Sequence, residues 1–209
     1  YRQPPGTQSV TEILTANIYI NKTFENFVIN RAVSSEAKES LSKAHRIAKA
    51  FALDPDKWVI LVGKNGCGKT HLAAATANAR SKKGEAVYFV TLPNLLDNLR
   101  KTFESNSRTT LEKRFQEVCM APVLILDHFD LSAATAWARE KIFQLIEYRY
   151  VQTLPTMITK PGDSLEDIDA VFRVRFSDTS LCEVIHITAP EYKGGVSQAA
   201  NPHNKTNRR

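Results

Sequence analysis

Long apolar runs are missing from this 209-residue sequence, in which no stretch approaches the roughly 18 consecutive apolar residues of a membrane-spanning helix. Cysteine is also scarce, because only Cys67, Cys119 and Cys182 are present and none of them forms a CxxC pair. This spacing argues against a zinc site or a disulfide framework. It favours a reducing, cytoplasmic setting instead.

The composition that remains is typical of a soluble globular protein. Hydrophobic residues make up 43% of the chain and charged residues 24%, and the formal net charge is +6. That charge permits a polyanionic partner such as nucleic acid without requiring one. Both ends are polar and weakly patterned, so we expect a flexible arm over residues 1–20, one ordered domain over 21–192 and a disordered basic tail over 193–209.

Strand and helix patterns alternate within the ordered part. Five short apolar segments predict strands: "WVILVG", "AVYFVT", "PVLILD", "LPTMIT" and "CEVIHIT". Helical spacing is expected between them and also before the first one, where Ser34 or Ser35 can cap a helix that runs to Phe51. Strands that are apolar along their whole length indicate an α/β fold with a parallel five-stranded sheet covered by helices on both faces. Ligands of such sheets bind beyond the carboxyl ends of the strands.

A phosphate-binding loop follows the first of these strands. "GKNGCGKT", residues 63–70, matches the G-x-x-x-x-G-K-[ST] pattern, in which backbone N–H groups, a lysine and a hydroxyl meet the phosphates and Mg²⁺ of a nucleotide. A chance glycine-rich turn is the alternative, but the preceding strand and the following helix argue against it. The expected contacts to ATP or ADP are Gly63, Lys64, Asn65, Gly66, Cys67, Gly68, Lys69, Thr70 and His71.

A second requirement of nucleotide chemistry is an aspartate at the end of a neighbouring strand. Asp127 ends "VLILD" and is expected to hold Mg²⁺ together with Thr70. The next position usually carries a second acid that orients the attacking water, but here it is His128. Asp130 is a substitute to consider, although a turn or helix-capping role suits it better.

Several segments together resemble the AAA+ ATPase domain of bacterial replicative-helicase loaders of the DnaC/DnaI type, and the similar IstB-type transposition ATPases. They are "TFENFVINRAVSSEAKESLSKAHRIAKAF", "WVILVGKNGCGKTHLAAATAN", "VYFVTLPNLLDNLRKTFE", "APVLILDHFD", "LPTMIT" and "FRVRFSD" followed by "APEYK". The resemblance spans roughly Phe24 to Tyr192. It implies a P-loop NTPase of the AAA+ class, three layers deep (α/β/α), in which the usual C-terminal lid domain is absent.

The resemblance also implies roles for individual residues and reveals two departures from the family pattern. The second acid falls on His128, and the sensor "TTN" falls on "TKPGD", where Thr159 is retained but the asparagine is not. The "RxRSRL" stretch aligns with "VFRVRF", so Arg175 resembles the arginine finger of a neighbouring subunit and Arg173 its companion. Both arginines fit equally well as exposed salt-bridge partners within the chain.

Basic residues near the third and fourth expected helices form a candidate surface for single-stranded DNA, which needs cations along a groove and aromatic platforms. An ordinary solvated helix face is the competing interpretation, because Glu112 and Glu117 are interspersed. The candidates are Arg100, Lys101, Phe103, Arg108, Lys113 and Arg114.

We therefore expect an ATP- and Mg²⁺-binding AAA+ protein of DNA replication that resembles a helicase loader. The expected partners are single-stranded DNA, a replicative helicase and further copies of the chain through Arg175. Catalytic roles would fall on Lys69, Asp127, His128 and Arg175. His128 and "TKPGD" together favour secure binding with weak or conditional hydrolysis. The alternatives are an IstB-like transposition ATPase, a non-hydrolysing ATP-dependent switch and, with less support, a small-molecule P-loop kinase.

Overall fold

Five parallel strands form the centre of the molecule. The computed structural model describes residues 17–30, 34–104 and 108–192. The strands pair in the order β2-β3-β4-β1-β5, and every pairing is parallel. The strand bounds are β1 Trp58–Gly63, β2 Tyr88–Thr91, β3 Leu124–Asp127, β4 Thr156–Pro161 and β5 Cys182–Ile187. The expected α/β fold with a five-stranded parallel sheet is confirmed.

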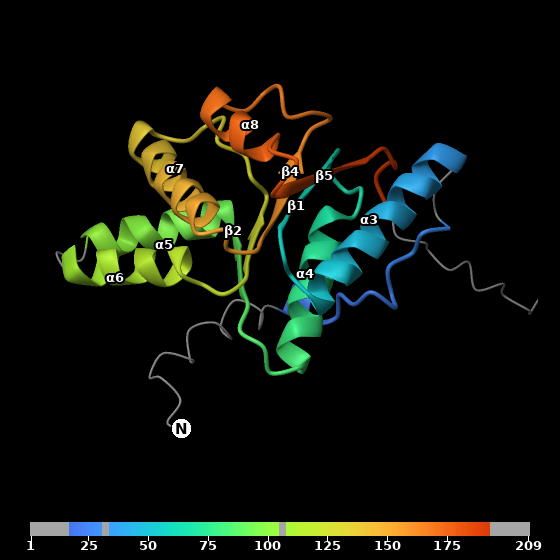
Figure 1. Ribbon diagram of the computed structural model, residues 1–209, viewed down its shortest axis with the longest axis horizontal. Helices are drawn as coiled ribbons and strands as arrows, with labels where there is room; N and C mark the ends of the chain where they lie inside the picture. Colours follow the sequence, from blue (N-terminus) through green and yellow to red (C-terminus); the bar gives the residue numbers. More distant parts are fainter. Residues whose placement is uncertain (1–16, 31–33, 105–107, 193–209) are drawn as a thin grey trace, which may run out of the picture.

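Helices cover both faces of the sheet (Figure 1). On one face, α3 (Ser35–Leu53) and α4 (Lys69–Lys82) pack on strand residues such as Val59 and Leu61. The other face carries Ile60 and Val62 against four helices. These are α5 Leu92–Glu104, α6 Arg108–Cys119, α7 Ala136–Val151 and α8 Ala170–Phe176. Because neighbouring strand residues alternate between the two covered faces, β1 and β3 are buried along their whole length, whereas the edge strand β5 has an exposed residue, His186.

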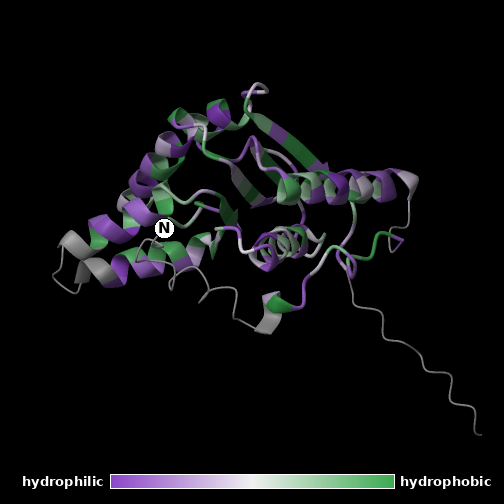
Figure 2. Cartoon of the chain, turned by 60° about the horizontal axis from the view of Figure 1, so that its bottom comes forward, coloured by the Kyte–Doolittle hydropathy of each residue, from purple (hydrophilic) through white to green (hydrophobic). Residues whose placement is uncertain are grey.

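Local signals in the sequence account for most helix boundaries. Ser34 caps α3 by accepting a hydrogen bond from the Ala37 backbone N–H at 3.1 Å, and Thr135 caps α7 in the same way. The helices alternate hydrophilic and hydrophobic residues along their length, as expected of helices with one buried face (Figure 2). No described helix is both long and apolar enough to cross a membrane.

Two short helices were not expected from the sequence. One is α2 (Asn17–Ile20), which packs on α4 through a hydrogen bond of 2.8 Å from Asn78 Nδ2 to the Tyr19 carbonyl oxygen. The other is α8, which includes both Arg173 and Arg175. Each has seven residues or fewer, which is too short for a clear helical period.

The strand order brings three functional segments to one edge of the sheet. β4 lies between β1 and β3, so the carboxyl end of β4 separates the phosphate loop after β1 from Asp127 at the end of β3. This edge is where a parallel sheet presents its ligand site.

Candidate nucleotide-binding site

The phosphate loop leaves β1 at Gly63 and turns sharply into α4. Gly66 and Gly68 have positive φ values of 74° and 109°, a backbone conformation that other residues adopt only with strain. A side chain at Gly66 would also collide with Glu191. The loop therefore keeps the curvature that directs backbone N–H groups at an anion and starts a helix behind it.

Lys69 lies inside this loop and is almost completely buried. Its Nζ donates hydrogen bonds to the carbonyl oxygens of Gly63 at 2.6 Å and Lys64 at 2.9 Å. The ammonium group is thereby held at the centre of the loop, where it would meet the phosphates of a nucleotide.

A hydroxyl–carboxylate network joins the ends of α4, β3 and β4. Thr70 Oγ1 donates to Asp127, 3.0 Å from Oδ1, and Thr159 Oγ1 donates to the same Oδ1 at 2.6 Å. The Thr159 hydroxyl also accepts the backbone N–H of His128 at 2.9 Å. Thr159 thus fixes both the predicted metal ligand and the residue that follows it.

The oxygen atoms at this point suit Mg²⁺. A carboxylate and a hydroxyl within hydrogen-bonding distance match the few protein ligands that Mg²⁺ takes in nucleotide sites, where phosphate and water oxygens complete the shell. The described part of the chain contains no group of three or more His, Cys, Asp or Glu side chains that could hold a metal without a nucleotide. Thr70 and Asp127 therefore fit a metal that arrives with the phosphates.

His128 occupies the position expected of a second acid and has a left-handed backbone conformation. β3 ends at Asp127, and His128 has a φ of 61°, in the left-handed region that His, Asn and Asp enter more readily than most residues. The exposed imidazole lines the pocket next to the phosphate loop. His128 therefore brings an imidazole to this position in place of a carboxylate.

Asp130 lies in the loop after β3 and forms a turn. Its Oδ1 accepts the backbone N–H of Ser132 at 2.9 Å, and the hydrogen bonds from Ser132 hold the pKa of the carboxyl below its usual range, with help from the nearby charges of His128 and Lys160. Asp130 lines two neighbouring hollows. This geometry agrees with the turn role and offers no replacement for the second acid.

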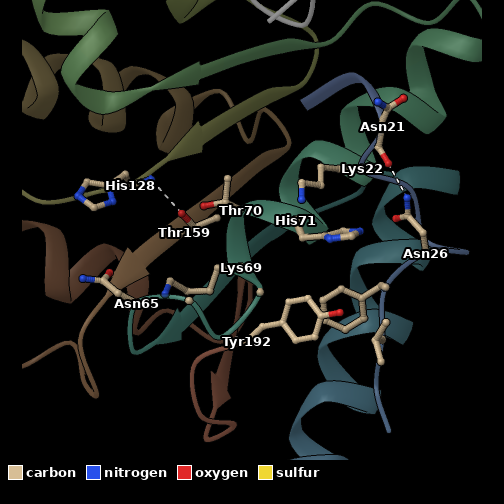
Figure 3. A pocket seen from close by; sticks show the side chains of 14 residues that line it. Asn21, Lys22, Asn26, Asn65, Lys69, Thr70, His71, His128, Thr159 and Tyr192 are labelled. Atoms are coloured by element: carbon tan, nitrogen blue, oxygen red, sulfur yellow. Dashed lines mark hydrogen bonds between the residues drawn. The ribbon is translucent and has the colours of Figure 1, made fainter. Parts of the chain in front are cut away.

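A pocket of about 600 Å³ extends from the phosphate loop to a segment that precedes α3 (Figure 3). We call residues 21–28 the strap. The strap forms the far wall of the pocket through Asn21, Lys22, Asn26, Phe27 and Val28. The remaining lining comes from the loop, His71, His128, Thr159 and Tyr192.

Histidines from two helices hold the strap in place. His71 Nε2 lies 2.8 Å from the Thr23 carbonyl oxygen, and His45 Nε2 lies 3.0 Å from the carbonyl oxygen of Phe24. Since a carbonyl only accepts, each imidazole donates from Nε2. Phe27 packs its ring against both imidazoles. His71, expected as a nucleotide contact, therefore lines the pocket and also supports its far wall.

The residue after Thr159 points away from this pocket. Lys160 is buried on the opposite face of β4, where its Nζ forms an ion pair of 2.7 Å with Asp167 and a hydrogen bond of 2.6 Å to the Pro161 carbonyl oxygen. The sensor segment therefore contributes one hydroxyl to the site and no amide.

The two arginines of α8 make ion pairs within the chain. Arg175 forms two hydrogen bonds of 2.9 Å to the carboxylate of Glu147 and lies over the ring of Tyr150. Arg173 contacts Glu166 at 3.1 Å. Both arginines thus form salt bridges within the chain. To act as an arginine finger, Arg175 would have to leave Glu147.

The candidate DNA-binding cations lie on α5 and α6, which run side by side on the opposite face of the sheet from α4 (Figure 1). Arg100 is exposed and contacts Asp97 at 3.7 Å. Lys101, Lys113 and Arg114 are exposed as well. The side chains of Phe103 and Arg108 lie outside the described part of the structure.

Sequence reasoning missed the strap and Tyr192 as parts of the pocket. The strap carried only the "TFENFV" part of the family resemblance, and its position depends on helices that follow it in the chain. Tyr192 carried one signal, the "APEYK" segment of the family resemblance.

Several known proteins are similar to this chain in sequence. The family model of IstB-like ATP binding proteins matches residues 8–187. The replicative helicase loader DnaC of Escherichia coli K12 is 26% identical over 162 residues, which is 77% of this chain and 63% of that protein. DnaC of Buchnera aphidicola subsp. Baizongia pistaciae is 29% identical over 136 residues, 63% of this chain and 52% of that protein. The chain thus spans between half and two thirds of the length of these relatives.

Solved structures show the same likeness. A crystal structure of the DnaC helicase loader superposes with a TM-score of 0.62 at 25% identity, covering 81% of this chain and 98% of the other. A crystal structure of DnaI gives a TM-score of 0.61 at 24% identity, with 83% and 92% covered. The replication initiator DnaA bound to AMPPCP and single-stranded DNA, at 16% identity and a TM-score of 0.63, shares the fold.

Proposed function

The chain belongs to the family of IstB-like ATP-binding proteins, and on that basis we propose that it binds ATP with Mg²⁺ between the phosphate loop and the strap. The observation that carries the proposal is the convergence of Lys69, Thr70, Asp127 and Thr159 at one sheet edge. Lys69 would bind the terminal phosphates. Thr70 and Asp127 would hold Mg²⁺, which neutralises phosphate charge when bound.

Hydrolysis would be weak or conditional. In-line attack on the γ-phosphate needs a positioned water, and His128 supplies neither negative charge nor a carboxylate for that purpose. A neutral imidazole accepts one hydrogen bond from water, so some turnover remains feasible. Nucleotide occupancy, more than turnover, would then control the activity of the protein.

Nucleotide binding is tested with charge-matched variants on α4. Lys69→Ala removes the buried ammonium, and Lys82→Ala removes an exposed one from the other end of the same helix. We expect titration calorimetry with ATP and Mg²⁺ to show binding by the unmodified protein and by Lys82→Ala, and loss of binding by Lys69→Ala. Equal affinity in all three proteins would refute the proposed site.

We also propose that the α5–α6 face binds single-stranded DNA. The support is the exposed cluster of Arg100, Lys101, Lys113 and Arg114, together with the net charge of +6. Phosphate contacts of this kind make affinity fall steeply with salt. Anisotropy of a labelled oligonucleotide should show a linear loss of log affinity with log salt, and a smaller slope once the four cations are replaced by Gln.

The biological role we propose is that of a loader-like ATPase domain, with residues 21–192 as the nucleotide-binding domain. The named relatives are replicative helicase loaders, and a cytoplasmic location would suit such a role. The family match to IstB-like proteins favours a transposition ATPase as the second candidate. Co-purification from the native organism distinguishes the two roles. A loader should co-purify with the replicative helicase, and a transposition ATPase with a transposase.

A further inference from the structure

The chain after β5 returns to the phosphate loop. The backbone N–H of Tyr192 donates to the Gly66 carbonyl oxygen at 3.0 Å, and Glu191 packs directly over Gly66. Ala189 is buried, and Thr188 N donates to Ser40 Oγ of α3 at 3.2 Å. Residues 188–192 are therefore fixed at both ends, one against α3 and the other against the tip of the loop.

This path places the Tyr192 side chain at the mouth of the nucleotide pocket. The ring lines the pocket and remains about half exposed, at 48%. In Figure 3, His128 lies on the left of the pocket, the strap residues Asn21 and Asn26 lie on the right, and Tyr192 lies below Lys69 between the two sides. The strap residues Phe27 and Val28 line the same pocket.

The polarity of the pocket decides which part of a nucleotide lies beside Tyr192. Phosphates belong with Lys69, Thr70 and Asp127, at the edge of the sheet where His128 lies. A nucleoside attached to them must extend in the other direction, along His71 towards the strap and Tyr192. A base that arrives there meets the ring of Tyr192 and the apolar side chains of Phe27 and Val28, which offer stacking surfaces. The polar strap residues Asn21, Lys22 and Asn26 line the same pocket and offer hydrogen-bonding groups.

We propose that Tyr192 stacks on the nucleobase and closes the nucleoside end of the pocket. The inference rests on the proposed ATP site and adds a base-binding residue to it. Residues 188–192 would thus serve both as a clamp on Gly66 and as a wall for the base.

The experiment separates base binding from phosphate binding. Tyr192→Ala removes the ring but keeps the backbone N–H that contacts Gly66, Tyr192→Phe keeps the ring, and Tyr148→Ala removes an exposed tyrosine from α7 as the control. Each protein is titrated with ATP and with inorganic tripolyphosphate in the presence of Mg²⁺. We expect Tyr192→Ala to weaken ATP binding about tenfold and to leave tripolyphosphate binding unchanged. Tyr192→Phe and Tyr148→Ala should match the unmodified protein for both ligands.

Two outcomes overturn the inference while the ATP site stands. One is unchanged ATP affinity in Tyr192→Ala. The other is equal weakening of ATP and tripolyphosphate, which would mean that the ring only stabilises the loop. Failure of the unmodified protein to bind either ligand would instead refute the ATP site, and the base contact with it.

Discussion

At the scale of single residues, Thr159 connects the two halves of the site. Its hydroxyl donates to Asp127 and accepts the His128 N–H, and the side chain is 1% exposed. Removing the hydrogen-bond partner of a buried polar group destabilises the folded protein, because water cannot reach the group to replace that partner. Thr159, the residue of the sensor segment that is retained, therefore stabilises the fold as well as positioning Asp127.

Thr159→Val should lower both stability and nucleotide affinity. The substitution leaves the His128 N–H without an acceptor and Asp127 with one donor fewer, so we expect a loss of about 1–3 kcal/mol in the free energy of unfolding. Urea denaturation measures this loss, and Thr159→Ser, which keeps the hydroxyl, should remain close to the unmodified protein. If the valine variant is as stable as the serine variant, the network has no energetic role.

Two buried thiols make the stability of the protein fall at alkaline pH. Burial raises the pKa of Cys119 to about 11 and that of Cys182 to about 12. The unfolded chain ionises its thiols first, near pH 9, so the stabilisation is complete below that pH and is lost as the pH rises towards 11.

Between pH 8 and pH 10 each thiol should therefore remove about 1 kcal/mol from the free energy of unfolding. The measurement is urea denaturation at both pH values on the unmodified protein and on a Cys119→Ala, Cys182→Ala double variant. The double variant should lose less stability over this interval. The same loss in both proteins would assign the effect to other groups.

At the scale of elements, Arg149 holds α6, α7 and β4 together. It is fully buried near the end of α7, and burial lowers its pKa to about 10. The guanidinium donates to the carbonyl oxygens of Cys119 at 2.9 Å, Ala121 at 2.8 Å and Pro155 at 2.6 Å, and to the hydroxyl of Thr156. The partial negative charge at the end of α6 offsets the buried cation.

Arg149→Met should destabilise the protein by about 3 kcal/mol or more, because several buried carbonyl groups lose their donors together. Arg114→Met, on the exposed face of α6, is the control and should change the free energy of unfolding by about 0.5 kcal/mol at most. Thermal or urea unfolding compares them. Similar stabilities would show that water or neighbouring groups replace the guanidinium.

The elements differ in how far the sequence alone predicted them. The strands, the phosphate loop and α3 to α7 have strong local signals: apolar runs, the glycine pattern and caps such as Ser34. The strap belongs to a segment of the family resemblance but has no local structural signal, since its position is set by His45, His71 and Asn78 on helices that follow it in the chain. The left-handed backbone of His128 likewise depends on the hydroxyl of Thr159, 31 residues away in sequence.

At the scale of the whole molecule, we propose that Arg175, which pairs with Glu147 within the chain, is the residue through which further copies would assemble. Glu147→Gln weakens this pair and should strengthen ATP-dependent self-association several-fold, whereas Arg175→Ala should abolish it. Glu140→Gln, on the exposed side of the same helix, is the control. Sedimentation velocity with ATP and Mg²⁺ measures the association. If Arg175→Ala still assembles like the unmodified protein, the finger lies elsewhere.

We propose that this site binds ATP tightly and hydrolyses it slowly. The most direct test measures ATP affinity and turnover side by side, with and without single-stranded DNA, on the unmodified protein, His128→Asp and His128→Asn. Both substitutes tolerate the left-handed backbone, and only aspartate brings the missing charge. We predict tight binding by all three and turnover at least about tenfold higher in His128→Asp alone. Turnover of the unmodified protein equal to that of His128→Asp would show that His128 does not limit hydrolysis.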